Sequence, residues 1–574
     1  MVMMTQWHCP THDPERVARL AAALNRHPAV AAILLNRGIS DHDQAQAFLS
    51  PTLAQIKSPF SIKDMEKAVD RIVQAVRQGE TICIFGDYDV DGMTSTSLLL
   101  DFFRHFDLTV LHHIPDRITE GYGLSPQAIE QQAVAKGVEL IITTDCGITG
   151  HEAVRLANRH GIDVIITDHH EPSKDLPDAL AVVNPKRLDC PSELAHLAGV
   201  GVAFYLALAL RHRLREMGFW NAGNEPNLKH ACDLVALGTV ADMVPLLGEN
   251  RVLVKAGLEI LATRPRPGLR ALLAISGAAN RPVDTWDLAY RLAPRLNAAG
   301  RLGTADTGCA LLTTACTKTA ERISFELDEM NVLRKDIEQR ILEDISRRLG
   351  QGPPTGRHTL VLKSPDWHEG VIGIVAARLV DQFMRPVALI ALRDGIGKGS
   401  ARSPEGVDLF GALSACSPYL EKFGGHKVAA GFSVKQENIS DFHEAFENAV
   451  RDHIDPQAMK PGIRIDTRIT PEMITPALLD DIEQIAPFGM ANPEPVFALS
   501  ELDAVSCHRV GKAHTKMRLR PKNGDRSRTL DAIIFNMDPA ELPGRFRQVA
   551  CNLRWNRWLG TKRAQVVIRD FKPE

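Results

Sequence analysis

Short apolar runs alternate with longer segments of helical character between residues 81 and 183. The runs are rich in Ile, Val and Thr, which favour strands. Five strands are predicted: TICIF (81–85), TVLHHI (109–114), ELIIT (139–143), DVIIT (163–167) and LAVV (180–183). Strands this apolar are buried on both faces, so the pattern predicts a parallel α/β sheet with helices on both sides.

Helical patterns dominate the segments around this sheet. Residues 1–60 are predicted as a helical lead-in, and residues 198–275 as mainly helical. Residues 318–350 contain few helix breakers and predict one long helix ending at Gly350, with GQGPPTG as a linker. A second α/β unit is expected over residues 355–455. After Pro461 the chain is β-rich, with five candidate strands: PVFALS, KMRLR, TLDAIIF, QVACNLRW and AQVVIRDF.

The composition is that of an ordinary globular protein. Of 574 residues, 44% are hydrophobic and 24% are charged, and the length corresponds to about four domains. The longest apolar run, near residues 200–210, is shorter than the ~18 residues that a membrane-spanning helix needs. No secretory signal is visible at the start, and the ten cysteines form no C-x-x-C pair. We therefore expect a soluble, cytoplasmic protein with no membrane contact.

The formal net charge of −3 is the sum of two opposite regions. Residues 505–574 contain 16 Lys and Arg against 6 Asp and Glu, a net of +10. The remaining 504 residues contain 51 basic and 64 acidic side chains, a net of −13. The nearly neutral total therefore conceals a compact basic tail.

Three aspartates alternate directly after the first predicted strand, in FGDYDVDGMTST. They are Asp87, Asp89 and Asp91. One interpretation is a calcium-binding EF-hand loop, but its twelfth position is Leu98, where a Glu is required, and a strand precedes it. The alternative is a carboxylate cluster at the carboxyl edge of the sheet, where ligands bind in open α/β folds.

Later segments also end in acids and histidines. ELIIT leads to Asp145, DVIIT to Asp168, His169 and His170, and a helix-like apolar segment to Asp242. A single Asp in such a place can be a cap or turn residue, but this alternative explains the whole set poorly. Converging carboxylates need cations, and carboxylates with imidazole and no thiolate suit Mn²⁺ or Mg²⁺. Two such ions would favour hydrolysis at phosphorus.

The series D-Y-D-V-D-G, T-D-C-G-I, T-D-H-H and A-D-M-V-P-L, in this order, resembles the DHH phosphoesterase superfamily. The resemblance implies two divalent cations, Mn²⁺ or Mg²⁺, with Asp145 as the bridging ligand. It implies a phosphate-facing role for His170 and a supporting role for Asp87. Many superfamily members have a histidine where this chain has Phe85. The implied metal ligands are Asp89, Asp91, Asp145, His169 and Asp242.

Two later segments supply positive charge. RLAPRLNAAGRLG carries Arg295, Asn297 and Arg301, and alone it could be a helix terminus with solvated arginines. The glycine-rich GKGSARS and FGGHKVAAG could be tight turns, although glycine also lets backbone N–H groups approach a phosphate. Together with WHEGVIGIVAARL, they resemble the DHH-associated DHHA1 domain. This resemblance implies substrate contacts at Ser400, Arg402, Gly424, Gly425 and His426.

The basic tail alternates charge with aromatic rings. One interpretation is a small β domain with core aromatics and a solvated face. The other is an OB-type barrel, in which rings stack on bases and cations follow the backbone of a single strand. The candidate contacts are Arg518, Arg520, Trp555, Arg557 and Trp558.

Over nearly the whole chain, these segments resemble the RecJ family of single-strand exonucleases. The expected fold is α/β, with five parts: a helical lead-in (1–60), a parallel-sheet DHH catalytic domain (61–317), a connecting helix (318–350), a DHHA1 substrate-binding domain (355–455) and an OB-like domain (461–574).

This resemblance implies a single-stranded-DNA-specific 5′-3′ exonuclease that uses two metals and releases 5′-mononucleotides in recombination and repair. It also implies cooperation with a single-strand-binding protein and a helicase, and we expect a monomer. Two alternatives remain open. One is a DHH phosphatase of oligoribonucleotides or small nucleotides, which has no use for a basic tail. The other is an inactive nucleic-acid-binding scaffold, in which metal ligands should have been lost.

Overall fold

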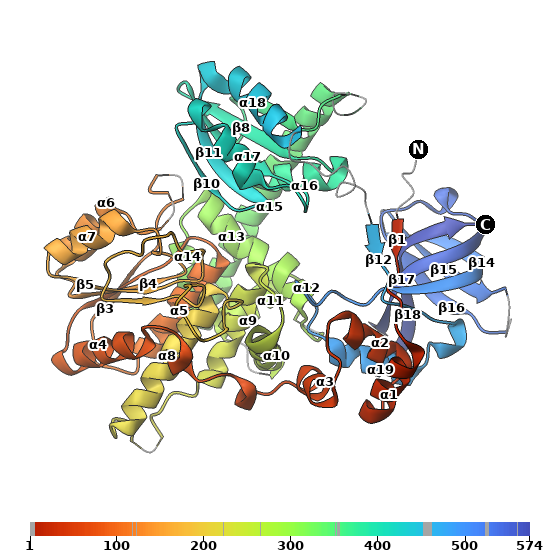
Figure 1. The fold of residues 1–574 in the computed structure, drawn as a ribbon, viewed down its shortest axis with the longest axis horizontal. Coiled ribbons are helices and arrows are strands. Elements are labelled where there is room, and N and C mark those ends of the chain that lie inside the picture. Colours follow the sequence, from red (N-terminus) through yellow and green to blue (C-terminus); the bar gives the residue numbers. More distant parts are fainter. Residues whose placement is uncertain are drawn as a thin grey trace. The chain divides into compact units, whose positions relative to one another are not determined.

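The computed structural model divides the chain into two compact units. The larger unit contains residues 57–244 and 256–461, and the smaller one residues 1–56, 245–255 and 462–574. Figure 1 shows the elements of both. The structure describes residues 6–117, 119–121, 123–221, 223–263, 266–279, 281–350, 352, 356–451, 462–511, 513–522, 527–558 and 561–574.

A parallel five-stranded sheet forms the core of the first domain of the larger unit. Its order is β3-β2-β4-β5-β6, and all neighbouring strands are parallel. The order places the ends of β2, β4 and β5 next to one another, so the residues that follow them share one edge. All five predicted strands are confirmed: β2 (Ile82–Phe85), β3 (Val110–His113), β4 (Leu140–Thr144), β5 (Asp163–Thr167) and β6 (Ala181–Val183).

Helices cover both faces of this sheet, as predicted (Figure 1). On one face, α6 (Pro126–Ala128) and α7 (His151–Arg159) enclose an apolar cluster with the strands. On the other face lie α4 (Met65–Gln78), α5 (Val90–Phe103) and α8 (Gly199–Glu216). Strand side chains alternate between faces, so β2, β4, β5 and β6 are buried on both sides, whereas the edge strand β3 is only partly buried.

The predicted helical stretch after the sheet is also confirmed. Over residues 198–275 it contains α8, followed by α9 (Cys232–Ala241), α10 (Gly248–Thr263) and α11 (Pro267–Ile275). Beyond the predicted bounds lie α12 (Thr285–Asp287), the π-helical turn η6 (Leu288–Leu292), α13 (Ala293–Leu302) and α14 (Asp306–Thr313). The long helix α15 spans Thr317–Leu349, and Gly350 ends it with a φ of 56°. Most of the expected linker at 350–356 lies outside the described residues. Among the described helices, none is long and apolar enough to cross a membrane.

The second domain of the larger unit is a five-stranded sheet in the order β10-β11-β9-β8-β7. β7 (Leu360–Ser364) is parallel to β8 (Val387–Arg393), and the other pairs are antiparallel. The other strands are β9 (Ile396–Arg402), β10 (Lys422–Gly425) and β11 (Ala429–Lys435). The helices of this domain are α16 (Ile372–Phe383), α17 (Leu409–Ala415) and α18 (Ile439–Arg451).

The smaller unit contains the expected C-terminal barrel. β14 (Phe497–Val510) pairs with both β15 (His514–Pro521) and β17 (Arg545–Trp558), which closes the sheet. β16 (Leu530–Ile534) and β18 (Thr561–Pro573) complete it, and β13 (Thr467–Arg468) extends it. A helix that the sequence pattern did not indicate, α19 (Pro476–Ile485), packs against β17.

The N-terminal segment shares its core with this barrel. Its helices are α1 (Pro14–Leu24), α2 (Pro28–Asn36) and α3 (His42–Leu49). Leu34 and Phe48 belong to the same buried cluster as Phe497 and Phe546. In addition, β1 (Gln6–His8) pairs in parallel with β12 (Gly462–Arg464). The two ends of the sequence therefore fold as one unit.

Candidate functional site

The loop after β2 brings three aspartates to the carboxyl edge of the parallel sheet. Asp89 caps α5, because its Oδ1 accepts hydrogen bonds from the backbone N–H groups of Asp91 (2.9 Å) and Gly92 (3.1 Å). The carboxylate of Asp91 accepts hydrogen bonds from the first N–H groups of α8, at Gly199 (2.6 Å) and Val200 (2.9 Å). The cap interpretation is thus correct for Asp89. The EF-hand interpretation is wrong, because α5 already begins at Val90.

Asp145 follows β4 in a left-handed backbone conformation, with a φ of 61°. The start of α8 passes directly beside its side chain. A Cβ atom on Gly199 would lie 2.5 Å from Oδ1 of Asp145, so this close approach requires glycine. The same turn of α8 therefore binds Asp91 and leaves space for Asp145.

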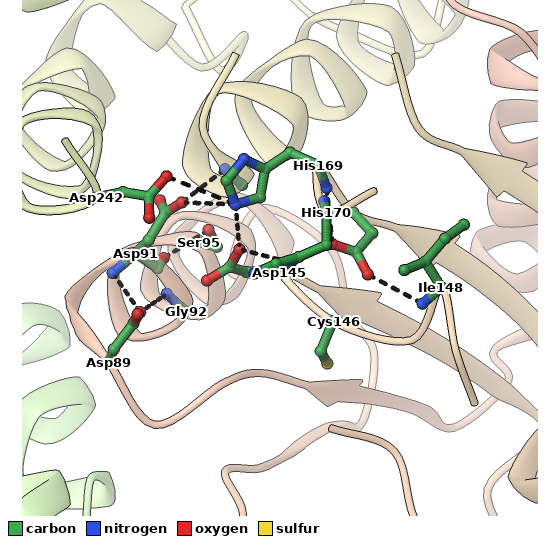
Figure 2. Close-up of polar contacts among 12 residues, drawn as sticks. Asp89, Asp91, Gly92, Ser95, Asp145, Cys146, Ile148, His169, His170 and Asp242 are labelled. Atoms are coloured by element: carbon green, nitrogen blue, oxygen red, sulfur yellow. Dashed lines mark hydrogen bonds and ion pairs between the residues drawn. The ribbon is translucent and has the colours of Figure 1, made fainter. Parts of the chain in front are cut away.

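The ring of His169 lies among three of these carboxylates. Figure 2 shows Asp91, Asp145 and Asp242 pointing toward it. Its Nε2 is 3.1 Å from Oδ1 of Asp145, 3.6 Å from Oδ2 of Asp242 and 3.8 Å from Oδ2 of Asp91. Asp242 is the C-cap residue of α9.

Three groups of side chains offer ligand atoms within 4.8 Å of one another. One group is Asp91, His169 and Asp242, a second is Asp87, Asp89 and Asp145, and a third combines Asp145 with both histidines. Oδ1 of Asp87 and Oδ2 of Asp242 are buried and accept no hydrogen bond within the described ranges. Carboxylate oxygens with one or two imidazoles fit hard divalent cations such as Mn²⁺ and Mg²⁺. Asp145 belongs to both the second and the third group, and His169 belongs to both the first and the third.

The acids of the site are held in an environment that opposes their ionisation. Burial, with added repulsion from Asp89, raises the pKa of Asp91 to about 7. Burial and the charges of Asp91 and Asp89 raise the pKa of Asp242 to about 9. Burial also raises the pKa values of Asp87 and Asp145 well above their ordinary range. Bound cations would remove this repulsion and keep the carboxylates ionised.

The two adjacent histidines have opposite electrostatic surroundings. Burial and the neighbouring His170 lower the pKa of His169 to about 3, so its ring is neutral and suited to ligation. Burial also opposes the charge of His170, but the hydrogen bond to Asp168 outweighs it and raises the pKa of His170 to about 9. His170 is therefore a cation at neutral pH.

Asp168, which the sequence analysis named among the strand-end acids but gave no role, holds both histidines in place. Its Oδ1 accepts hydrogen bonds from Nδ1 of His170 (2.8 Å) and from the N–H groups of His169 (2.7 Å) and His170 (3.0 Å). Its Oδ2 accepts one from Ile148 (2.9 Å). Its place directly before the two histidines, after an apolar strand, was the available signal.

Three of the predicted substrate residues gather beside the acids. The His426 ring lies parallel to His170, with centroids 6.3 Å apart. Arg402, on β9, donates to Oγ of Ser400 (3.1 Å), and Arg301 donates to the carbonyl of Gly370 (2.9 Å). Burial and neighbouring arginines lower the pKa of Arg301 to about 9, and burial and Arg117 lower that of Arg402 to about 10. Each would gain from an anionic ligand.

Arg117 was also missed. It follows β3 at the same edge of the sheet, and its guanidinium lies 4.9 Å from the centre of the Tyr88 ring. Its charge contributes to lowering the pKa values of both Arg301 and Arg402, which places it in the same cationic group. A basic residue in the loop after a predicted strand was the signal.

The turn interpretation is wrong for GKGSARS but correct for part of FGGHKVAAG, in which residues 426–428 connect β10 to β11 and the N–H of His426 donates to the carbonyl of Ala429 (2.8 Å). GKGSAR lies in β9, and Gly424 and Gly425 end β10. The glycines of β9 are needed for packing, because a Cβ atom on Gly399 would lie 2.1 Å from the Phe432 ring. Only Gly425, with a φ of 146°, has a backbone that favours glycine.

The remaining predicted residues of the larger unit lie further from the acids. Nε of Arg295 donates to Asp328 of α15 (2.8 Å). Asn297 is half-buried on α13. The helix-terminus interpretation is correct for the position of Arg301, in the last turn of α13, but its guanidinium is half-buried rather than solvated. Phe85 is buried at the end of β2 and packs edge-on against His113, with centroids 5.5 Å apart.

The predicted tail residues lie on several strands of the barrel. Arg518 and Arg520 are on β15, and Arg518 donates to Oγ1 of Thr529 (2.8 Å). Trp555 donates from Nε1 to Asp480 (2.8 Å) and Arg557 to Glu483 (2.8 Å), both on α19. The side chain of Trp558 lies outside the described part of the chain. Of the tail aromatics, Phe546 belongs to the core.

Three family profiles match the parts of this chain. The DHH family, N-terminal domain, matches residues 81–239, the DHHA1 domain residues 356–452, and the RecJ OB domain residues 465–570. The parallel sheet with its acid and histidine edge thus defines a DHH phosphoesterase with a DHHA1 domain and an OB domain.

The full-length comparisons agree. The single-stranded-DNA-specific exonuclease RecJ of Escherichia coli (strain K12) is 38% identical over 587 aligned positions, which cover 100% of both chains. The crystal structure of RecJ from Thermus thermophilus in complex with Mn²⁺ matches with a TM-score of 0.84 at 31% identity, covering 100% of this chain and 80% of that one. The corresponding Mg²⁺ complex gives 0.77 at 29% identity, covering 99% and 79%. The chain belongs to the RecJ family.

Proposed function

We propose that this protein is a single-stranded-DNA-specific exonuclease that hydrolyses phosphodiester bonds with two divalent cations. The observation that carries the proposal is the pair of acid and histidine groups that Asp145 joins at the edge of the parallel sheet. It is supported by a curated relative that is named a single-stranded-DNA-specific exonuclease and is 38% identical over the full length of both chains. Two solved relatives contain Mn²⁺ or Mg²⁺.

Each residue of the site has a proposed role. Asp89, Asp91, Asp145, His169 and Asp242 hold the cations, with Asp145 between them, and Asp87 supports the loop. When bound, the two cations lower the pKa of water and stabilise charge on the attacking and leaving oxygens. His170, held as a cation by Asp168, faces the scissile phosphate and stabilises the negative charge that develops on it.

The cationic residues beside the acids orient the strand. Arg301, Arg402 and His426 approach the same edge, and their buried positive charge suits a phosphate. We assign Ser400, Gly424 and Gly425 to the same surface of the DHHA1 domain. The barrel residues Arg518 and Arg520 are proposed to contact the strand backbone.

The proposal includes 5′-3′ polarity, release of 5′-mononucleotides and a role in recombination and repair, in line with the family. A single-strand-binding protein and a helicase are the proposed partners, and a cytoplasmic monomer is the proposed state. Co-purification with each partner and light scattering of the full chain would test these assignments.

One assay tests the proposed activity. Single strands of DNA and RNA, labelled at either end, and a DNA duplex are incubated with the full chain and Mn²⁺, Mg²⁺ or a chelator. We expect mononucleotide release from the 5′ end of single-stranded DNA only, and none with chelator. Asp145→Asn should reduce cleavage at least about 1,000-fold. Asp107→Asn, an exposed acid outside the site, is the matched control. Full activity of Asp145→Asn would contradict the proposal.

A further inference from the structure

Two large aromatic rings are exposed on the helix that leads into the site. Trp286 on α12 is 49% exposed, and Tyr290 on the adjoining turn η6 is 67% exposed. Their ring centroids are 5.4 Å apart, with 36° between the planes. Exposed apolar surface of this size commonly marks a binding surface.

Positive charge accompanies the two rings. The guanidinium of Arg291 lies 5.3 Å from the centre of the Trp286 ring. Arg291 (3.2 Å) and Arg281 both pair with the carboxylate of Asp287, which is fully buried. Two cations thus share one buried anion, and Asp284, the exposed N-cap of α12, adds a second negative charge to the same surface. The guanidinium of Arg291 places one cationic group directly beside rings that can stack on bases, an arrangement that suits a nucleic-acid strand.

The rings share one helix with the predicted substrate contacts. α12, η6 and α13 follow one another without interruption from Thr285 to Leu302. Trp286 and Tyr290 are four residues apart with their rings side by side, and Asn297 and Arg301 are four residues apart on one side of α13. The π-helical turn η6 connects the two pairs. Fifteen residues separate Trp286 from Arg301, or about 22 Å along the axis. This length corresponds to at most about six stacked nucleotides.

We propose that Trp286 and Tyr290 form a stacking platform for bases of the single strand several nucleotides away from the scissile bond. The inference rests on the proposed function. Base–aromatic stacking tolerates any sequence, as an exonuclease that moves along a strand requires. Arg291 would contact the backbone beside the stacked bases. The platform would hold the strand while its end lies at Arg301 and Arg402.

The test compares a long with a short substrate on the full chain. The substrates are a 5′-phosphorylated thymidine dodecanucleotide, which reaches the platform, and the trinucleotide, which does not. For Trp286→Ala with Tyr290→Ala, we expect the Kd of the dodecanucleotide to rise about 5- to 100-fold. The kcat/KM of the trinucleotide should change less than about twofold. Trp286→Phe should retain most of the affinity, because phenylalanine can still stack.

Phe219→Ala provides a matched control, since Phe219 is an exposed aromatic residue of the same unit at 42% exposure. Thermal melts confirm that each variant is folded. Unchanged dodecanucleotide binding by the double variant would overturn the proposal, as would an equal loss on both substrates, which indicates a structural role. If the double variant lost binding to a protein partner but kept its affinity for the dodecanucleotide, the rings would be a protein-binding surface and the proposal would be wrong. If the unmodified chain cleaves neither substrate, the proposed function itself fails.

Discussion

Nδ1 of His170 donates a 2.8 Å hydrogen bond to Oδ1 of Asp168, and this pair converts an imidazole into a stable cation. Asp168 is fully buried and is held in place by backbone N–H groups from the loops after β4 and β5, at Ile148 and His169. Burial opposes its ionisation, but the hydrogen bonds from His170 and the backbone outweigh this and lower its pKa. The adjacent His169 is neutral, because burial and the charge of His170 lower its pKa to about 3.

Asp168→Asn tests whether catalysis needs the positive charge of His170. The substitution removes the negative charge that raises the pKa of His170 to about 9, so this pKa should fall toward its ordinary value of 6.5. In the variant, His170 then loses its proton at pH values where it is still charged in the unmodified chain. We expect kcat/KM to fall by roughly 10- to 100-fold at pH 8, and less at pH 6. The pH profile of cleavage at saturating Mn²⁺ measures the difference.

Asp189→Asn is the control for this experiment. It also removes a carboxylate from an ion pair, because Asp189, whose side chain is 55% exposed, pairs with the guanidinium of Arg187. Its pH profile should match that of the unmodified chain. If Asp168→Asn lowered the rate equally at pH 6 and pH 8, the charge of His170 would not be the reason.

The raised pKa values of the acids predict that metal binding stabilises the fold more at higher pH. Asp91 and Asp242, with pKa values of about 7 and about 9, keep protons that an unfolded chain releases near pH 4. Their contribution to the stability of the metal-free protein is fully present below the unfolded pKa and is lost as the pH rises through these folded values. Cations replace the protons and restore this stability.

The gain in Tm on adding Mg²⁺ or Mn²⁺ should therefore increase from pH 6 to pH 9. Thermal melts with cation or chelator measure it, and calorimetry in two buffers should detect proton release on binding at pH 6. In Asp242→Asn the increase with pH should be smaller. An equal gain in Tm at pH 6 and pH 9 would show that the free acids are already ionised.

Gly199→Ala should displace the side chain of Asp145 and so weaken metal binding, although Gly199 is not itself a predicted ligand. The new Cβ atom would lie 2.5 Å from Oδ1 and 2.6 Å from Cβ of Asp145, and Gly199 also donates its N–H to Asp91. We expect a stability cost of about 1–3 kcal/mol and metal affinity reduced by roughly 10- to 100-fold. Calorimetric titration with Mn²⁺ measures the affinity.

Gly544→Ala is the matched control, because nothing lies within 4 Å of its added Cβ atom. It should change the free energy of unfolding by less than about 0.5 kcal/mol. Wild-type metal affinity in Gly199→Ala would contradict the assignment of Asp145 as the shared ligand.

Local patterns in the sequence were sufficient to predict the sheet and most of the acidic site. The strands of the first sheet are continuous apolar runs, and parallel strands must end at a common edge, so these patterns alone place Asp87, Asp145 and His169 together. The resemblance to DHH phosphoesterases then supplied the roles. A cap role and a metal-ligand role are not exclusive alternatives for a strand-end aspartate. The carboxylate of Asp89 both caps α5 and belongs to a candidate metal group.

Features that depend on contacts between distant residues could not be predicted. The shared core of α1 to α3 with the barrel joins Leu34 to Phe497, and no local pattern encodes that pairing. The glycines of β9 resembled turn residues because the partner ring of Phe432 lies over thirty positions later in the chain. In the same way, α19 brings Asp480 to Trp555, so a ring taken as a free stacking surface already has a partner.

Strand binding by the barrel is best tested with point substitutions, because deleting residues 461–574 would expose the core shared with α1 to α3. The side chain of Arg518 is 59% exposed, and its Nε lies 4.0 Å from Oδ1 of Asp531. If Arg518 contacts a phosphate, Arg518→Ala should flatten the plot of log K against log salt for single-stranded DNA by about 0.7. Fluorescence anisotropy over a range of salt measures the slope. Arg215→Ala, an exposed arginine paired with Glu225 in the other unit, should leave it unchanged. An unchanged slope for both Arg518→Ala and Arg520→Ala would show that this face of the barrel does not bind the strand.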